Sequence, residues 1–102
     1  MIPKILKTAI ELGASDIIIS PGNVPAIKKS GEIVYLDDFG VVSGESLKEE
    51  IFTMIPEKLK QEFTDELEID FSVQAEGLGR FRVNGFKQKG GYGLVFRIIA
   101  EI

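Results

Sequence analysis

The amino-acid sequence contains no cysteine and no histidine. Without cysteine, disulfides, thiolate nucleophiles and cysteine-ligated metal sites are excluded. Without histidine, the chain lacks the commonest general base and the commonest zinc ligand, so hydrolases built on a serine–histidine pair are excluded as well. We therefore expect no metal site and no catalytic residue that acts by itself in this chain.

Long apolar runs and a phosphate-binding loop are also missing. The longest uninterrupted apolar run is residues 33–36, whereas a membrane span needs about 20 apolar residues. The first four residues lack the apolar core of a secretory signal. The nearest approach to the motif G-x-x-x-x-G-K-[ST] lies at 22–30, where Ile27 replaces the second glycine. The sequence thus predicts a soluble, cytoplasmic domain.

The composition that is present is that of one globular domain. A chain of 102 residues matches the usual domain size of about 100–150 residues. Its 44% hydrophobic and 27% charged residues are ordinary globular values, which argues against disorder, collagen and coiled coil.

The net charge of −4 is unevenly distributed along the chain. Residues 43–76 carry ten carboxylates and three lysines, whereas residues 77–100 carry five basic side chains and no acid. Charge runs are usually solvated faces, which favours internal pairing of the basic segment with acidic helices. The alternative is that the basic segment meets an anion. An acidic chain with few interleaved aromatics is a poor nucleic-acid binder, so no nucleic-acid partner is expected.

Hydrophobic periodicity predicts three helices, and alternation of apolar and polar residues predicts strands. The helices are expected at 2–12, from Ser43 or Ser46 to Ile55, and from Pro56 through Phe63. The strands are expected at 16–20, 24–29, 32–36 and 68–75. Ser46 and Glu49 have the spacing of a capping box at the start of the second helix.

A three-residue loop at 77–79 is expected to join the strand at 68–75 to the next strand. This loop places Val73 opposite Val83 and Gln74 opposite Arg82. Apolar residues then meet apolar residues, which a one-residue slip would prevent.

The last hairpin is expected to turn with two or four residues around 90–91. It places Val83 opposite Ile98 and Asn84 opposite Arg97. Four polar side chains then share the face opposite the apolar one. They are Arg80, Arg82, Asn84 and Arg97.

With this pairing, Arg82 and Arg97 lie diagonally on adjacent strands, with Cβ atoms about 7–8 Å apart. Their planar guanidinium groups would converge on one multivalent anion such as phosphate. The alternative is that Glu76, opposite Arg80, and the nearby Asp70 neutralise this face through surface ion pairs. The anion hypothesis loses its basis if the arginines point to opposite faces or if a carboxylate holds one of them internally.

Segments along the whole chain occur in a distinctive order. They are Gly13-Ala14-Ser15-Asp16, Ser20, Pro25-Ala26-Ile27 before Gly31, residues 68–72 and 77–84, Phe86, Gln88, Gly90-Gly91 and Val95-Phe96-Arg97. In this order they resemble the PilT-type retraction ATPases of type IV pili, which serve twitching motility.

The resemblance implies an α+β fold: a PAS-like antiparallel β-sheet with helices packed on one face, forming a single domain over residues 1–102. It implies the N-terminal domain of a hexameric motor of the secretion-ATPase superfamily. The phosphate-binding loop would lie in a RecA-like domain, whose linker is expected to begin near Ile102. ATP and magnesium would be cofactors of the intact protein and not of this domain.

The resemblance also implies partners and a location. The partners are the RecA-like ATPase domain of the same and of the neighbouring subunit, the other subunits of a homohexamer, and the pilus base machinery. The location is the cytoplasm, peripheral to the inner membrane through that machinery.

In the family, two arginines of the N-terminal domain, fifteen residues apart, lie near the ATP phosphates. Arg82 and Arg97 match that pattern. They would stabilise negative charge on the γ-phosphate as arginine fingers do. Arg80 and Asn84 are expected at the rim of the same site.

The sequence departs from the family pattern at two positions. Ile18 stands where relatives often carry histidine, and Gly85 replaces a residue that is usually apolar. Gly85 predicts a β-bulge that turns Phe86 to the other face.

Two other functions fit a PAS-like domain without a role in nucleotide binding. A small-molecule sensor would need an interior pocket, whereas the predicted core is filled by isoleucine, leucine, phenylalanine and valine with no buried polar anchor. A protein-interaction module would use the acidic helices of residues 43–68 as its surface.

Overall fold

The computed structural model describes residues 1–89 and 91–101. Over these residues the chain forms three α-helices, one 3-10 helix and six strands. The helices are α1 (Ile2–Glu11), the 3-10 helix (Asp37–Phe39), α2 (Gly44–Met54) and α3 (Glu57–Asp65). The strands are β1 (Asp16–Ile19), β2 (Ala26–Lys29), β3 (Glu32–Tyr35), β4 (Glu68–Ala75), β5 (Gly79–Gln88) and β6 (Gly91–Glu101).

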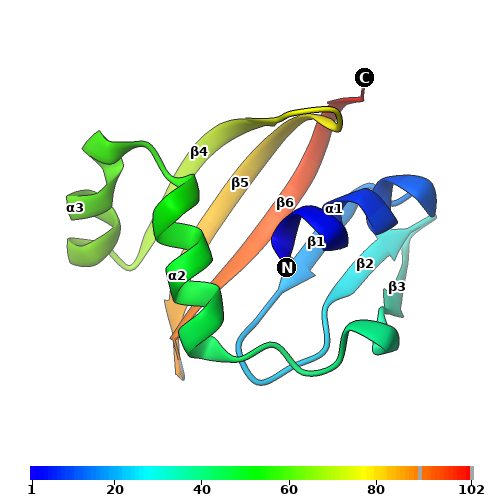
Figure 1. Ribbon diagram of the computed structural model, residues 1–102, viewed down its shortest axis with the longest axis horizontal. Coiled ribbons are helices and arrows are strands. Elements are labelled where there is room, and N and C mark those ends of the chain that lie inside the picture. The colour runs from blue at the N-terminus through cyan, green and yellow to red at the C-terminus, as the bar shows by residue number, and fades with distance from the viewer. Residues whose placement is uncertain (90, 102) are drawn as a thin grey trace.

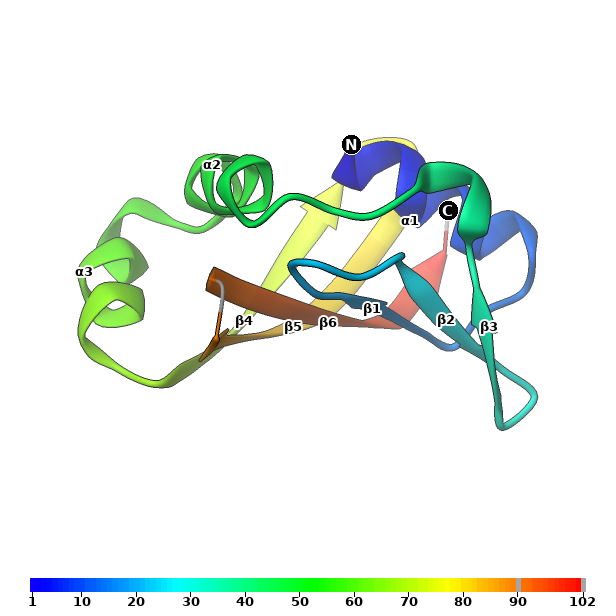
Figure 2. The same cartoon turned by 90° about the horizontal axis from the view of Figure 1, so that it is seen from below.

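The strands form one antiparallel sheet in the order β3-β2-β1-β6-β5-β4. Helices α1 and α2 lie on one side of this sheet, and α3 lies beside its β4 edge (Figures 1 and 2). No helix of the described residues covers the opposite side, which we call the open face. The expected α+β class, an antiparallel sheet with helices packed on one face, is confirmed.

An apolar stripe holds α1 against the sheet. Its buried residues recur at helical spacing and are Ile2, Ile5, Leu6 and Ala9. Pro3 occupies the first turn, where a helix does not use the backbone N–H, and Gly13 at φ +80° follows the end. The helix expected at 2–12 is confirmed within one residue.

The start of α2 shows which serine caps it. The Ser43 side-chain oxygen accepts a hydrogen bond from the Ser46 backbone N–H at 3.1 Å. Ser43 is therefore the N-cap, and the capping box at Ser46 and Glu49 is not formed. Pro56 precedes α3 as expected.

Gly85 is explained by α3 and not by a bulge. A Cβ on Gly85 would lie 3.1 Å from the Phe63 ring, which is fully buried. The register continues unbroken through Gly85, and the only shift between β5 and β6 lies at Arg80 and Phe81. The bulge predicted at Gly85 is thus wrong. The predicted change of face is wrong as well: the alternation continues, and Phe86 lies on the open face with Arg82 and Asn84, over Gly93.

The β4–β5 hairpin differs from prediction by two residues. The turn is residues 76–78, with Ala75 paired to Gly79, and Val73 lies opposite Phe81 and not Val83. Gly79 belongs to the ladder because β6 passes close to it: a Cβ there would lie 2.1 Å from the Ala100 carbonyl oxygen. Gln74 accordingly pairs with Arg80 and not with Arg82.

The last hairpin also differs by two residues. Gln88 pairs with Gly91, so Val83 lies opposite Phe96 and not Ile98. Arg97 lies opposite Arg82, and the predicted pairing of Arg97 with Asn84 is wrong. Gly90, where the turn was expected, is outside the described residues. The predicted faces are nevertheless correct, because a shift of two residues preserves the side of the sheet.

Candidate functional site

A row of polar side chains crosses five strands on the open face. Cross-strand partners connect Lys28 on β2 to Asp16 on β1, Asp16 to Arg97 on β6, Arg97 to Arg82 on β5, and Arg82 to Ser72 on β4. Residues directly opposite in an antiparallel pair point to the same face. The row therefore places three cations and one carboxylate side by side.

Arg82 and Arg97 are closer together than predicted. They are direct cross-strand partners, for which the Cβ separation is about 4.5–5.5 Å and not the diagonal spacing. Both line a hollow of about 190 Å³ together with Asp70, Asn84 and Val95. Because like charges directly opposite destabilise a sheet, this pair favours an anionic ligand between the two guanidinium groups.

A buried carboxylate holds Arg97. The Arg97 Nε donates to Asp16 Oδ1 at 3.0 Å. The Asp16 side chain is 12% exposed, whereas the Arg97 side chain is 72% exposed. As stated from the sequence, the anion hypothesis loses its basis if a carboxylate holds one of the arginines internally. Asp16 holds Arg97 in this way through Nε. The terminal nitrogens of Arg97 make no hydrogen bond with the described residues.

Arg82 has no carboxylate partner within the described residues. Asp70 also lines the hollow, but it accepts from the Asn84 side-chain amide at 3.1 Å, and Glu68 accepts from the same amide at 3.4 Å. The ion pairs proposed to neutralise this face through Asp70 and Glu76 do not form with the arginines of β5. Arg82 is thus the less satisfied of the two converging cations.

The two rim residues occupy different places. Asn84 lines the hollow itself. Arg80 lies two residues along β5, opposite Gln74 and Ala100, and lines a separate depression with them. Of the two, only Asn84 lines the hollow that contains the arginine pair.

Ile18 lies next to a residue that lines the hollow. It pairs with Val95, which lines the hollow, and it is half-buried. Histidine at this position would add a titratable group beside the arginines. The chain has an uncharged side chain there instead.

The sequence analysis missed Asp16 as a member of the site. The alternation along β1 indicates the face of Asp16. Ile17 and Ile19 are fully buried, so Asp16 and Ile18, which alternate with them, share the opposite face of the sheet. The pairing of β1 with β6 brings it to Arg97. Such a long-range pairing is not readable from local alternation.

Residues 1–89 and 91–101 contain no group of three or more acidic side chains placed to hold a metal ion. None of the helices formed by these residues is long and apolar enough to cross a membrane.

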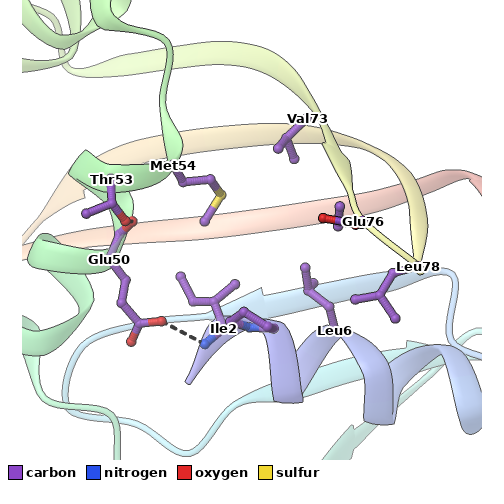
Figure 3. Close-up of a pocket in the computed structure, with 10 residues that line it drawn as sticks. Ile2, Leu6, Glu50, Thr53, Met54, Val73, Glu76 and Leu78 are labelled. Atoms are coloured by element: carbon purple, nitrogen blue, oxygen red, sulfur yellow. Dashed lines mark hydrogen bonds between the residues drawn. The ribbon is translucent and has the colours of Figure 1, made fainter.

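A second hollow lies on the helix side of the sheet, between α1, α2 and the end of β4 (Figure 3). Its volume is about 380 Å³. Most of its lining is apolar and includes Ile2, Leu6, Met54, Val73 and Leu78. Two carboxylates border it, on Glu50, which accepts from the Ile2 backbone N–H at 2.9 Å, and on Glu76. The core is filled as predicted, yet its margin is open here.

Known proteins with a similar sequence are pilus ATPases. No model of a known protein family matches the chain. The type IV pilus ATPase PilU of Pseudomonas aeruginosa is 32% identical over 96 residues, which cover 94% of this chain and 25% of that protein. The type IV pilus retraction ATPase PilT of the same organism is 34% identical over 98 residues, covering 96% and 28%. The chain thus spans about a quarter of the length of the curated relatives it matches.

Two solved ATPase structures superpose on nearly the whole of this chain. A crystal structure of the pilus retraction motor PilT with bound ADP superposes with a TM-score of 0.86 and 37% identity, covering 95% of this chain and 28% of that one. The Legionella pneumophila ATPase DotB superposes with a TM-score of 0.80 over 97% of this chain and 28% of its own. At 21% identity the likeness to DotB concerns the fold alone.

Proposed function

We propose that residues 1–102 form the PAS-like N-terminal domain of a hexameric type IV pilus retraction motor. The support is that this chain is homologous to a domain of the PilT-type pilus ATPases. The task of this domain is to pack on a nucleotide-bearing RecA-like domain and to supply arginines to the ATP phosphates. The observation that carries this proposal is the direct pairing of Arg82 with Arg97 on the open face.

The chemistry of the pair suits a triphosphate. Two guanidinium groups offer forked donors that match phosphate oxygens, and among the described residues no carboxylate pairs with Arg82 to compete with them. In a loose phosphoryl-transfer transition state, cations near the γ-phosphate stabilise the developing charge. The open face carries no helix of its own, which leaves room for a nucleotide presented by another domain.

The remaining parts of the proposal follow from this arrangement. ATP and magnesium are held by the RecA-like domain of the same or the neighbouring subunit of a homohexamer. The motor works in the cytoplasm, peripheral to the inner membrane through the pilus base machinery. The 102-residue chain alone binds ATP weakly and does not hydrolyse it.

The experiment is steady-state ATP hydrolysis by the full-length motor carrying Arg82→Ala or Arg97→Ala. We expect kcat to fall about 100- to 1000-fold, as for loss of one preorganised donor to a transition state. The matched control is Lys58→Ala, which removes the same charge from an exposed position on α3. Activity near that of the control in both arginine variants would refute the arginine role.

The hollow beside α1 and α2 supports a second candidate function, which is binding of a small molecule. Its volume of about 380 Å³ is within the usual range for ligand sites of about 300–1,000 Å³. Glu50 already pairs with the N-terminal ammonium at 3.3 Å, so apolar walls and the carboxylate of Glu76 suit a ligand with an apolar body and one cationic group (Figure 3).

Thermal unfolding of the 102-residue chain distinguishes the two candidates, because a ligand of the folded state raises Tm by mass action. The probes are 4-phenylbutylamine and its anionic counterpart 4-phenylbutyrate, together with Mg-ATP. A rise in Tm with the amine alone, abolished by filling the hollow in Ala75→Leu, favours the small-molecule function. No response to the amine removes that function and leaves the motor proposal as stated.

A further inference from the structure

We infer that Asp16 is a positioning residue for Arg97: it holds the guanidinium through Nε and so reserves the terminal nitrogens for an anion on the open face. This inference rests on the proposed function and adds to it a residue from β1, outside the arginine-bearing strands. Two observations support it: the hydrogen bond between Asp16 and Arg97, and the burial of Asp16.

The contact is selective among the atoms of Arg97. The bond of 3.0 Å joins Asp16 Oδ1 to Nε, which is the donor nearest the aliphatic stem of arginine. The remaining donors sit on the two terminal nitrogens, the ones that form a forked contact with a phosphate. An ion pair through those terminal nitrogens would instead have consumed them.

The burial of Asp16 makes the contact obligatory. Asp16 is the only charged residue that is buried among residues 1–89 and 91–101, and a buried carboxylate must be paired and hydrogen-bonded. Besides Arg97, its side chain receives a hydrogen bond only from the Ser15 hydroxyl, at 3.5 Å. Releasing Arg97 would therefore leave the carboxylate poorly satisfied, so the guanidinium stays in place.

The same carboxylate balances the charges of the row. Asp16 lies between Lys28 and Arg97, and Arg97 lies next to Arg82. Without it, three cations would stand in sequence on one face. The charge of Asp16 thus offsets part of the repulsion in the row, a contribution to stability that is separate from the placement of Arg97 by the hydrogen bond.

The test separates the hydrogen bond from the charge with a matched pair of variants in the full-length motor. Asp16→Asn and Asp16→Ala both remove the negative charge, but only asparagine keeps an oxygen that accepts from Nε. We expect Asp16→Ala to lower kcat at least about 10-fold, since misplacing a group by about 1 Å costs up to about 100-fold. Asp16→Asn should stay within about 3-fold of wild type, and KM should change little in either.

A double variant tests whether Asp16 acts through Arg97. In an Arg97→Gln background, Asp16→Ala should lower kcat no further, because residues acting as a unit are not additive. Equal loss in the two Asp16 variants, or full additivity with Arg97→Gln, overturns the positioning role. An unchanged kcat in Arg97→Gln alone refutes the phosphate contact proposed for Arg97, and with it this inference, whereas equal loss in the two Asp16 variants refutes the inference alone, so the two failures are distinguishable.

A measurement on the wild-type 102-residue chain keeps the inference testable if Asp16→Ala does not fold. The Arg97 Nε–H should exchange with water at least about 10-fold more slowly than the Arg80 Nε–H, because a hydrogen bond protects it. Arg80 has no salt bridge within the described residues and serves as the internal control. Equal exchange rates at the two arginines overturn the inference without involving ATP at all.

Discussion

Replacing Gly79 by alanine tests the pairing of the first residues of β5 with the end of β6. Gly79 has φ +125° and pairs with Glu101 at the end of the β5–β6 ladder. An alanine Cβ would lie 2.1 Å from the Ala100 carbonyl oxygen and 2.9 Å from the Glu101 Cα. Both are backbone atoms, so no side-chain rotation relieves the clash, and the ends of the two strands must separate.

The expected loss of stability has two parts. Holding a non-glycine residue at this φ costs about 1–3 kcal/mol. Separating the pairs of Gly79 and Arg80 with β6 removes hydrogen bonds with a net value of about 0.5–1.5 kcal/mol each. We therefore expect a loss of about 3 kcal/mol or more in the free energy of unfolding, from a total that is typically about 5–15 kcal/mol.

The assay is urea and thermal unfolding of the 102-residue chain, with Gly77→Ala as the control. Gly77 lies two residues earlier, in the turn at 76–78, with φ +77°, but a Cβ there would meet no atom within 4 Å, so only the left-handed backbone penalty of about 1–2 kcal/mol applies. A loss of about 3 kcal/mol in Gly79→Ala lowers Tm by about 12–24 °C. If Gly79→Ala is no more destabilised than Gly77→Ala, the close approach of β6 to Gly79 is wrong.

Three further outcomes are expected from unfolding measurements on the same chain. Phe63→Ala should cost about 3–5 kcal/mol, because its fully buried ring fills the space over Gly85; a loss below about 1 kcal/mol contradicts this packing. Ser43→Ala should cost about 1 kcal/mol through loss of the α2 cap, whereas Ser46→Ala should have little effect. Arg82→Gln should raise Tm at low salt by removing a like charge opposite Arg97, and the gain should disappear in 1 M NaCl; a lower Tm at low salt argues against repulsion.

Helices and faces were largely readable from local pattern. The stripe of α1 and the proline before α3 act within a few residues of the elements they define. The alternation in β5 and β6 correctly placed Arg82, Asn84 and Arg97 on the face opposite Phe81. The errors concerned the registers of the last two hairpins, the cap of α2 and the bulge predicted at Gly85. Gly79 and Gly85 accommodate backbone or a ring from distant segments and do not form the predicted turn or bulge.

The candidate site was predicted in part. The convergence of the two arginines followed from strand parity, but their direct opposition and the Asp16 contact did not. Asp16 reaches Arg97 because β1 pairs with β6, two strands far apart in the sequence. No spacing rule between neighbouring residues signals such a pairing.

The sequence by itself determined which side of the sheet each side chain occupies, because successive residues of a strand alternate between two faces whatever the strand pairs with. It also determined what the chain lacks, since no fold supplies a missing histidine, cysteine or phosphate-binding loop. Only the tertiary structure decided the partners within a face. A shift of two residues keeps the alternation intact, and contacts between distant segments decide which partners meet, as Asp16 and Arg97 do where β1 pairs with β6.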